Sequence, residues 1–254
     1  MKATNFDLKQ YFLRIGFVGP AQADLGTLTS LMRCQLRSVP FENLDVQAKQ
    51  VVSLVPEEIV EKILTRGRGG YCYEVNGIFS MALEALGIGY RYVAARPMFY
   101  PMRRPRTHMA LLACIDGEEY LCDLGFGSHG LRAPLALAQL NIAVTQDRET
   151  YQLSQPNEGE YLLQTLVDGA WLNQYGFDLS KQEWVDFVPA NYFNSTHPDT
   201  IFVQKYLVIR QTEQGRKLLV GDVFQVVSET GVEKRVVTQE ELPALLWQEF
   251  GLRR

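Results

Sequence analysis

Apolar residues recur every three or four positions through the first third of the chain, a spacing that predicts amphipathic helices. One series covers residues 8–15 and a second covers residues 25–36. A third begins at Pro56 and stops before the glycines at 67, 69 and 70. A fourth runs from about residue 72 to residue 86. The first third is therefore expected to be helical.

From residue 88 the pattern changes to short alternating or β-branched runs, which predict a sheet or barrel. The runs lie at residues 90–94, 108–115, 120–124, 161–167 and 171–177, and in the tail at 202–210, 217–220 and 235–237. A final helix is expected at a capping box formed by Thr238 and Glu241, although Pro243 fits poorly inside it. The chain shows no repeat or charged linker, so the segments should pack as one body.

Composition and net charge indicate which classes of protein the chain can belong to. The 254 residues are 46% hydrophobic and 21% charged, which suits a globular protein of one large domain or two to three small ones. A net charge of -4 argues against nucleic acid as a partner. Charged residues break any signal-peptide core near the N-terminus, and no apolar run approaches the ~18 residues that span a bilayer. We therefore expect a cytoplasmic protein without membrane contact.

Four cysteines form no CxxC pair and no metal-ligand spacing, so we expect reduced thiols and no bound metal. Cys72 stands out because it opens a predicted helix, where unpaired N–H groups and the helix dipole favour a thiolate nucleophile. Gly69 and Gly70 before it would leave room for a substrate and for N–H groups that face an oxyanion. The alternative is a buried cysteine that opens a core helix.

Asp116-Gly117 is a strong signal for a two-residue hairpin turn, which would pair residue 115 with 118, 112 with 121 and 110 with 123. His108 then lies diagonally opposite Asp123 on the same face, so the carboxylate can orient the imidazole. In this register Cys114 and Cys122 face opposite sides and are poorly placed for a disulfide. The alternative is that His108 is an ordinary strand residue whose ring makes structural hydrogen bonds, and that Asp123 caps the turn that follows the strand.

Cys72, His108 and Asp123 together supply the nucleophile, base and orienting acid of a thiol triad. Around them the sequence resembles the arylamine N-acetyltransferases over essentially its whole length. The resemblance is carried by five ordered motifs: Val39-Pro40-Phe41-Glu42-Asn43-Leu44-Asp45, Arg68-Gly69-Gly70-Tyr71-Cys72-Tyr73-Glu74-Val75-Asn76, Thr107-His108-Met109, Asp123-Leu124-Gly125-Phe126-Gly127 and Asn194-Ser195-Thr196-His197-Pro198.

This resemblance implies an α+β multidomain fold with a cysteine-protease-like core. Its expected parts are a helical domain at residues 1–86 with the nucleophile, a β-barrel domain at 87–187 with the histidine and aspartate, and a C-terminal α/β lid at 188–254. It also implies ping-pong chemistry: acetyl-CoA acetylates Cys72, and an arylamine, hydrazine or arylhydroxylamine then takes the acetyl group. His108 would remove the thiol proton and Asp123 would fix the orientation of the ring.

Further roles follow from the same resemblance. Arg68 and Glu42 are expected to form a structural ion pair behind the site. Phe126 and Phe202 are expected as aromatic walls of the acceptor pocket, which suits a flat apolar amine, or else as plain core.

The glycine-rich loop after Asp123 is expected near the CoA pyrophosphate, with the backbone N–H groups of Gly127, Ser128 and Gly130 as an anion nest. By contrast, the segment at residues 100–106 has no match in the family. Its three arginines, Arg103, Arg104 and Arg106, belong to a solvated loop by default, or else meet CoA phosphates.

Other functions use the same residue types. A thiol hydrolase or transglutaminase-like enzyme also has Cys, His and Asp in this order, an amide synthase shares the triad, and a non-catalytic binding module is a further alternative. Acetyl-CoA discriminates the acetyltransferase from the hydrolase, because the acetyltransferase is expected to take one acetyl group on Cys72. The spacing of the triad does not exclude the amide synthase. The sequence favours arylamine acetylation and leaves the preferred amine open.

Overall fold

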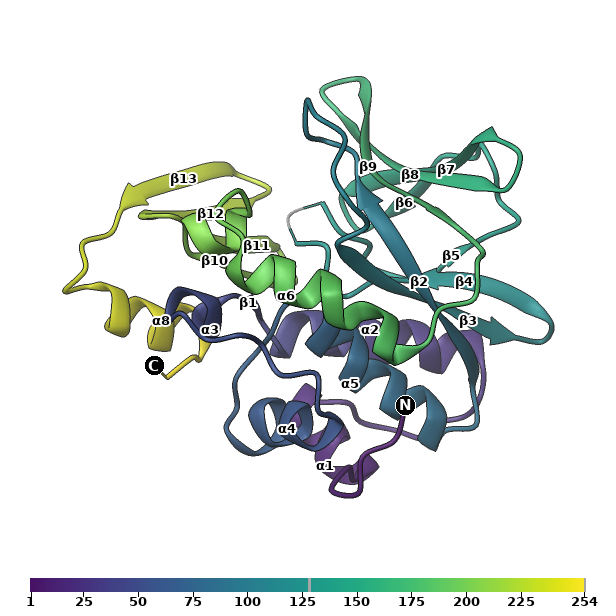
Figure 1. Cartoon of the computed structure of the whole chain (residues 1–254), viewed down its shortest axis with the longest axis horizontal. Helices are drawn as coiled ribbons and strands as arrows, with labels where there is room; N and C mark the ends of the chain where they lie inside the picture. Colours follow the sequence, from purple (N-terminus) through teal and green to yellow (C-terminus); the bar gives the residue numbers. More distant parts are fainter. Residues whose placement is uncertain (128, 254) are drawn as a thin grey trace.

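A computed structural model of the chain describes residues 1–127 and 129–253 and has an α+β fold (Figure 1). An eight-stranded antiparallel sheet stands over the helices of the N-terminal third, and a five-stranded sheet with the C-terminal helix lies beside them (Figure 1). Among the described residues, no helix combines the length and the apolar character needed to cross a bilayer.

The N-terminal helices follow the apolar spacing of the sequence. They are α1 (Leu8–Ile15), α2 (Leu25–Ser38), α3 (Leu44–Gln47), α4 (Pro56–Val60), which continues as a π-helical turn over Glu61–Thr65, and α5 (Cys72–Ala85). Asp7 and Asp24 cap the first two, because each carboxylate accepts a hydrogen bond from a backbone N–H of the first turn. The four longer predicted helices are confirmed, whereas α3 is too short to show a helical period.

The larger sheet has the strand order β5-β4-β3-β2-β9-β8-β7-β6 and is curved into a nearly closed barrel (Figure 1). Its strands are β2 (Gly89–Pro97), β3 (His108–Ile115), β4 (Glu118–Cys122), β5 (Leu135–Ala136), β6 (Val144–Gln146), β7 (Glu149–Asn157), β8 (Glu160–Val167) and β9 (Ala170–Asp178). Four of the five predicted runs of this region lie wholly in strands, and the run at 120–124 does so only as far as Cys122. The short strands β5 and β6 and the polar strand β7 were not predicted.

The β3–β4 hairpin has the register that its turn predicts. Ile115 pairs with Glu118 and Leu112 with Leu121. Asp116 and Gly117 both adopt positive φ, 52° and 84°, as a two-residue type I′ turn requires. All four cysteines are free thiols. Because β4 ends at Cys122, Asp123 is the first residue beyond the ladder and remains next to the start of β3.

The C-terminal region forms a second antiparallel sheet, in the order β1-β10-β11-β12-β13. Its strands are β1 (Phe41–Glu42), β10 (Leu207–Thr212), β11 (Gly215–Val220), β12 (Val223–Ser228) and β13 (Gly231–Val236), and its neighbouring helices are a 3₁₀ turn (Trp184–Phe187), α6 (Val188–Thr196), α7 (Ile201–Gln204) and α8 (Leu242–Phe250). β1 comes from the N-terminal third, so the chain crosses the predicted domain boundaries to complete this sheet. The division into three domains stays a prediction.

Two expectations for the tail need correction. The run at 202–210 was predicted as one strand, but its first residues belong to α7 and only Leu207 onward is extended, because a short apolar run does not distinguish helix from strand. The capping box is present, since Thr238 and Glu241 exchange hydrogen bonds. The helix begins after it, at Leu242, so Pro243 occupies the first turn, where a missing N–H has no cost.

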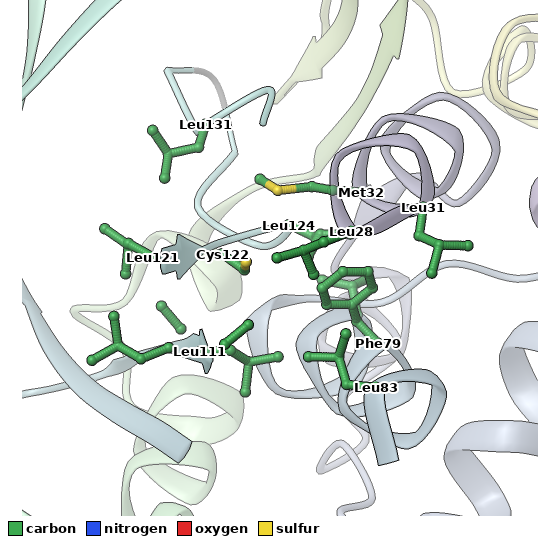
Figure 2. Close-up of a cluster of buried hydrophobic side chains, with 14 of the residues drawn as sticks. Leu28, Leu31, Met32, Phe79, Leu83, Leu111, Leu121, Cys122, Leu124 and Leu131 are labelled. Atoms are coloured by element: carbon green, nitrogen blue, oxygen red, sulfur yellow. The ribbon is translucent and has the colours of Figure 1, made fainter. Parts of the chain in front are cut away.

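The core joins α2 and α5 to the β3–β4 hairpin. Figure 2 shows Leu28, Leu31, Met32, Phe79 and Leu83 from the helices beside Leu111, Leu121 and Cys122 from the sheet and Leu124 from the segment after β4. Side chains of this kind stabilise the fold by about 1.5–3 kcal/mol each when fully buried. Cys122 is a packing residue within this cluster. The cluster holds the N-terminal end of α5 close to the chain that leaves β4.

Candidate functional site

Cys72 is the first residue of α5, as its sequence predicts. Glu74 fixes this end of the helix, because its Oε2 accepts a hydrogen bond of 3.0 Å from the N–H of Tyr71. The thiol lies where the helix presents its unpaired N–H groups, a setting that stabilises negative charge. Cys72 is only 2% exposed, so it is reached through a cavity and not from the open surface.

Gly125 brings the chain after β4 against α5, the helix that begins at Cys72. A Cβ atom at Gly125 would lie 2.5 Å from Cα of Cys72, closer than real Cβ atoms essentially ever approach, and 3.0 Å from Cγ2 of Val75, which is a tight contact. The contact involves backbone on both sides and cannot be relieved by a rotamer change. Glycine at this position therefore sets the separation between Cys72 and the segment that carries Asp123.

His108 and Asp123 form a buried pair. Nε2 of His108 lies 2.7 Å from Oδ2 of Asp123, and the two residues are 4% and 1% exposed. The contact that the hairpin register predicts is present. Because Nε2 is engaged by the carboxylate, Nδ1 is the ring nitrogen left for the Cys72 thiol.

Burial and charge act in opposite directions on this pair. Burial disfavours the charged imidazolium, but the Asp123 carboxylate, by its charge and its hydrogen bond, and the Cys72 side chain raise the pKa of His108 to about 10. Burial also opposes the charge of Asp123, yet His108, the N–H of Gly125 and the amide of Asn76 hold the pKa of that carboxyl below its usual value. The site therefore favours a protonated imidazole beside an ionised carboxylate.

Asn76 supports the pair, a role that the sequence analysis did not assign to it. Its Nδ2 donates to the backbone oxygen of Met109 at 2.7 Å and to Oδ1 of Asp123 at 3.3 Å. Its Oδ1 accepts from the N–H of Leu124 at 2.9 Å. Asn76 lies one helical turn after Cys72, so the same helix that presents the thiol also holds the β3–β4 hairpin. The spacing of about one helical turn between Cys72 and Asn76 was the feature of the sequence that could have indicated this role.

A buried cluster of charged side chains lies behind α5, the helix that begins at Cys72. Nη2 of Arg68 lies 2.8 Å from Oε1 of Glu42, so the predicted pair is in contact. Lys62, which the sequence analysis did not single out, adds contacts of 2.6 Å to both Asp45 and Glu74. Since Glu74 also caps α5, this cluster fixes the end of the helix that bears Cys72.

The glycines before Cys72 do not have the role that the sequence analysis expected. A Cβ at Gly69 would lie 1.9 Å from the carbonyl oxygen of Pro40, and one at Gly70 would lie 2.6 Å from the Glu74 side chain. Neither residue lines the cavity at Cys72. Their missing side chains make room for the chain itself and not for a substrate.

A largely apolar cavity of about 290 Å³ opens onto Cys72 and His108. Phe126 and Phe202 both line it, as expected, and the ring of Phe126 lies 5.0 Å from that of His108. Ring contacts with Tyr71 and Phe41 hold Phe202 in place. The cavity thus joins an aromatic surface to the thiol and the imidazole.

The glycine-rich loop reaches this cavity in part. Gly127 lines it, whereas Ser128 lies outside the described residues. Gly130 does not line it, and its N–H donates to the backbone oxygen of Gly127 at 3.3 Å. Contact between these three residues and a CoA pyrophosphate stays a prediction.

The three arginines of residues 103–106 face different surroundings. Arg106 pairs with Asp178, Arg103 is exposed beside a neighbouring depression, and Arg104 lines the cavity at Cys72. Of the three arginines, only Arg103 therefore has the surroundings of a solvated loop.

Within residues 1–127 and 129–253, no three His, Cys, Asp or Glu side chains are grouped to hold a metal ion.

Comparison with known proteins shows which family the chain is similar to. A family described as N-acetyltransferase matches residues 24–253. The arylamine N-acetyltransferase of Escherichia coli is 33% identical over 253 residues, which cover 96% of this chain and 88% of that protein.

Solved structures agree with the sequence comparison. The arylamine N-acetyltransferase of M. tuberculosis superimposes with a TM-score of 0.91 at 32% identity and covers 96% of this chain and 93% of its own. The Mycobacterium marinum arylamine N-acetyltransferase in complex with CoA gives a TM-score of 0.90 at 30% identity, with 96% and 92% covered. The similarity extends over nearly the whole of each chain.

Proposed function

The chain belongs to the arylamine N-acetyltransferase family and is an acyltransferase with acetyl-CoA as its co-substrate, and from that premise we propose that the acetyl group passes through a thioester on Cys72. The acceptors are arylamines, arylhydroxylamines and hydrazines. The reaction takes place in the cytoplasm, where thiols such as Cys72 stay reduced. Cys72, His108 and Asp123 are the catalytic residues of this proposal.

In the first half-reaction the sulfur of Cys72 attacks the carbonyl carbon of acetyl-CoA while His108 holds the thiol proton. The bond between the acetyl carbon and the CoA sulfur breaks, and His108 returns the proton to the departing CoA thiolate. The raised pKa of His108, about 10, supports this step, because the imidazole readily accepts a proton beside Asp123.

In the second half-reaction the amine nitrogen attacks the thioester carbon. His108 takes a proton from the nitrogen, the bond between carbon and Cys72 sulfur breaks, and the thiol is regenerated. The aromatic wall at Phe126 orients a flat amine beside the thioester. Asp123 keeps the imidazole in one orientation through both halves.

One observation carries the proposal: a buried imidazole, bonded to a carboxylate at 2.7 Å, shares an apolar cavity with a thiol at a helix N-terminus. A nucleophile, a base and a space for a flat acceptor are thereby brought together. The expected lid role of residues 188–254 is part of the proposal, supported by Phe193, Phe202 and Ile209 in the cavity wall.

The test is to mix the protein with acetyl-CoA and no amine, and to follow the release of CoA. We expect a burst of one CoA per chain, followed by turnover only after an arylamine is added, with parallel lines in double-reciprocal plots. Cys72→Ala should show no burst while its circular dichroism is unchanged.

Two results would contradict the proposal. Release of CoA only when the amine is present would indicate direct transfer without an acetyl-enzyme. Continued rapid release of CoA without an amine would instead indicate a thiol hydrolase.

A further inference from the structure

A second depression, of about 350 Å³, lies beside the cavity that contains Cys72. The two share no lining residue, but neighbouring residues of one segment line different sites. Phe99 and Arg104 line the cavity at Cys72, whereas Met98 and Arg103 line the depression. A ligand in the depression therefore contacts the segment that forms a wall of the catalytic cavity, without contact to the thiol.

Positive charge exceeds negative charge in this depression. The side chains of Arg96, Arg103 and Arg106 line it, together with the carboxylate of Glu160. Arg106 is paired with Asp178. In the part of the chain that the structure describes, no carboxylate forms an ion pair with Arg96 or Arg103. Two guanidinium groups in one depression are thus without a counter-ion.

The arginines repel one another. Burial and the positive charges of Arg103 and Arg106 lower the pKa of Arg96, and Glu160 only partly offsets them. An anion bound between these side chains would relieve the repulsion. The planar fork of an arginine is suited to the oxygens of a carboxylate or a phosphate group.

An aromatic surface adjoins the arginines. Tyr161 of β8 and Phe177 of β9 both line the depression, and their rings are stacked with centres 5.3 Å apart and 15° between the planes. Such a surface offers apolar contact to the organic part of a ligand. The depression thus combines a place for an anion with a place for a small organic group.

We propose that this depression binds the phosphate monoester group of a small organic molecule other than the acetyl donor. A phosphate monoester carries about 1.5 to 2 negative charges at pH 7, so it matches two guanidinium groups better than a carboxylate does. Arg96 and Arg103 hold the phosphate oxygens, and the organic part lies against Tyr161 and Phe177.

The 3′-phosphate of CoA has the same chemistry and is the other source of such a group. CoA that reacts with Cys72 enters the catalytic cavity, which has no lining residue in common with the depression. The separation of the two sites therefore favours an independent ligand.

The experiment measures the binding of phenyl phosphate and of phenyl sulfate, a monoanion of nearly the same shape, by isothermal titration calorimetry at constant ionic strength. We expect one phenyl phosphate per chain, with a Kd about fivefold or more below that of phenyl sulfate. Arg103→Gln changes an exposed side chain and should raise the Kd of phenyl phosphate about fivefold or more. Glu160→Gln should lower this Kd about twofold or more, because it removes a like charge from the depression.

Arg104→Gln is the matched control, since it removes the same charge from the next residue, whose side chain lines the cavity at Cys72. We expect the Kd of phenyl phosphate to change less than about twofold in this variant. Equal losses in Arg103→Gln and Arg104→Gln, a larger loss in Arg104→Gln, or no binding to the wild type would overturn the inference.

A titration in the presence of CoA separates the two sources of phosphate. We expect saturating CoA to leave the Kd of phenyl phosphate unchanged. Displacement by CoA and not by dephospho-CoA would overturn the inference and identify the 3′-phosphate of the co-substrate as the ligand. Displacement by both would show that the depression is not an independent site. None of these titrations involves acetyl transfer, so their outcome is separate from that of the proposed function.

Discussion

His108 is stabilised in its charged form inside the protein. Its neighbour Asp123 outweighs the burial that would otherwise favour a neutral ring, and the pKa of His108 rises to about 10 from an ordinary value near 6.5. A pKa that is higher in the folded state means that protonation stabilises folding. This stabilisation is complete below about pH 6.5 and is lost as the pH rises through about 10.

We expect Asp123→Asn to remove this dependence. In the wild type the free energy of unfolding should decline between about pH 6.5 and pH 10, because folded His108 keeps a proton that the unfolded chain has lost, and in the variant this decline should be absent. Activity should fall by about 10²- to 10⁴-fold at pH 7, because the imidazole loses its orienting charge. Urea unfolding at a series of pH values measures the first effect.

Asp199→Asn is the matched control, since Asp199 lies 4.0 Å from an exposed histidine and should not alter the pH dependence of stability. If the wild type and Asp123→Asn lost stability in parallel from pH 7 to pH 10, the charged pair would be excluded as the cause.

Secondary-structure elements could be predicted where a single local sequence signal determined their type or register. The Asp116-Gly117 turn fixed the register of β3 and β4, and this register brought His108 to Asp123. β7 (Glu149–Asn157) was not predicted, because only Tyr151 and Leu153 are large apolar residues in a run of polar side chains. Arg104 was expected only in a solvated loop or at CoA phosphates, and Asn76 was given no role, because the contacts of both side chains depend on how separate elements pack.

The contact between α5 and the end of β4 depends on the missing side chain of Gly125. We expect Gly125→Ala to push Cys72 away from the segment that carries Asp123, since a Cβ would lie 2.5 Å from Cα of Cys72. A displacement near 1 Å is expected to slow the chemistry by about 10²-fold. The rate of CoA release in the first turnover is the appropriate measurement.

Gly89→Ala is the control for this change, because a Cβ at that strand position meets nothing closer than 3.9 Å. We expect it to retain the first-turnover rate. Equal rates for Gly125→Ala and Gly89→Ala would show that the close approach at Cys72 does not matter for catalysis.

At the scale of the whole molecule, Glu149 connects the two sheets. The carboxylate lies on β7 and contacts Arg216 of β11, while Arg132 at 2.5 Å, Tyr151 at 2.7 Å and His129 at 3.1 Å bind it from its own side. Burial opposes its charge, but these partners lower the pKa of Glu149 to about 2. Because His129 lies in the glycine-rich loop, the same carboxylate also supports that loop.

We expect Glu149→Gln to lower the free energy of unfolding at pH 7 by about 3 kcal/mol, since it removes the negative charge that Arg132 and Arg216 share. A pKa that is lower in the folded state gives stability that is present above about pH 4.3 and lost as the pH falls through about 2. The difference between wild type and variant, measured by urea unfolding, should therefore shrink over that interval.

Glu213→Gln serves as the comparison, because the pair of Glu213 with Arg37 lies at the surface and should contribute nothing measurable. A difference between wild type and Glu149→Gln that stayed constant down to pH 2 would contradict the proposed role of the carboxylate.

Of the four thiols in the chain, only that of Cys72 is expected to carry the acetyl group. Intact mass after treatment with acetyl-CoA alone, followed by peptide mapping of Cys34, Cys72, Cys114 and Cys122, tests this directly. We expect one acetyl group per chain, located on Cys72 and discharged when an arylamine is added. An unchanged mass, or an acetyl group on another cysteine that an arylamine discharges, would contradict the account.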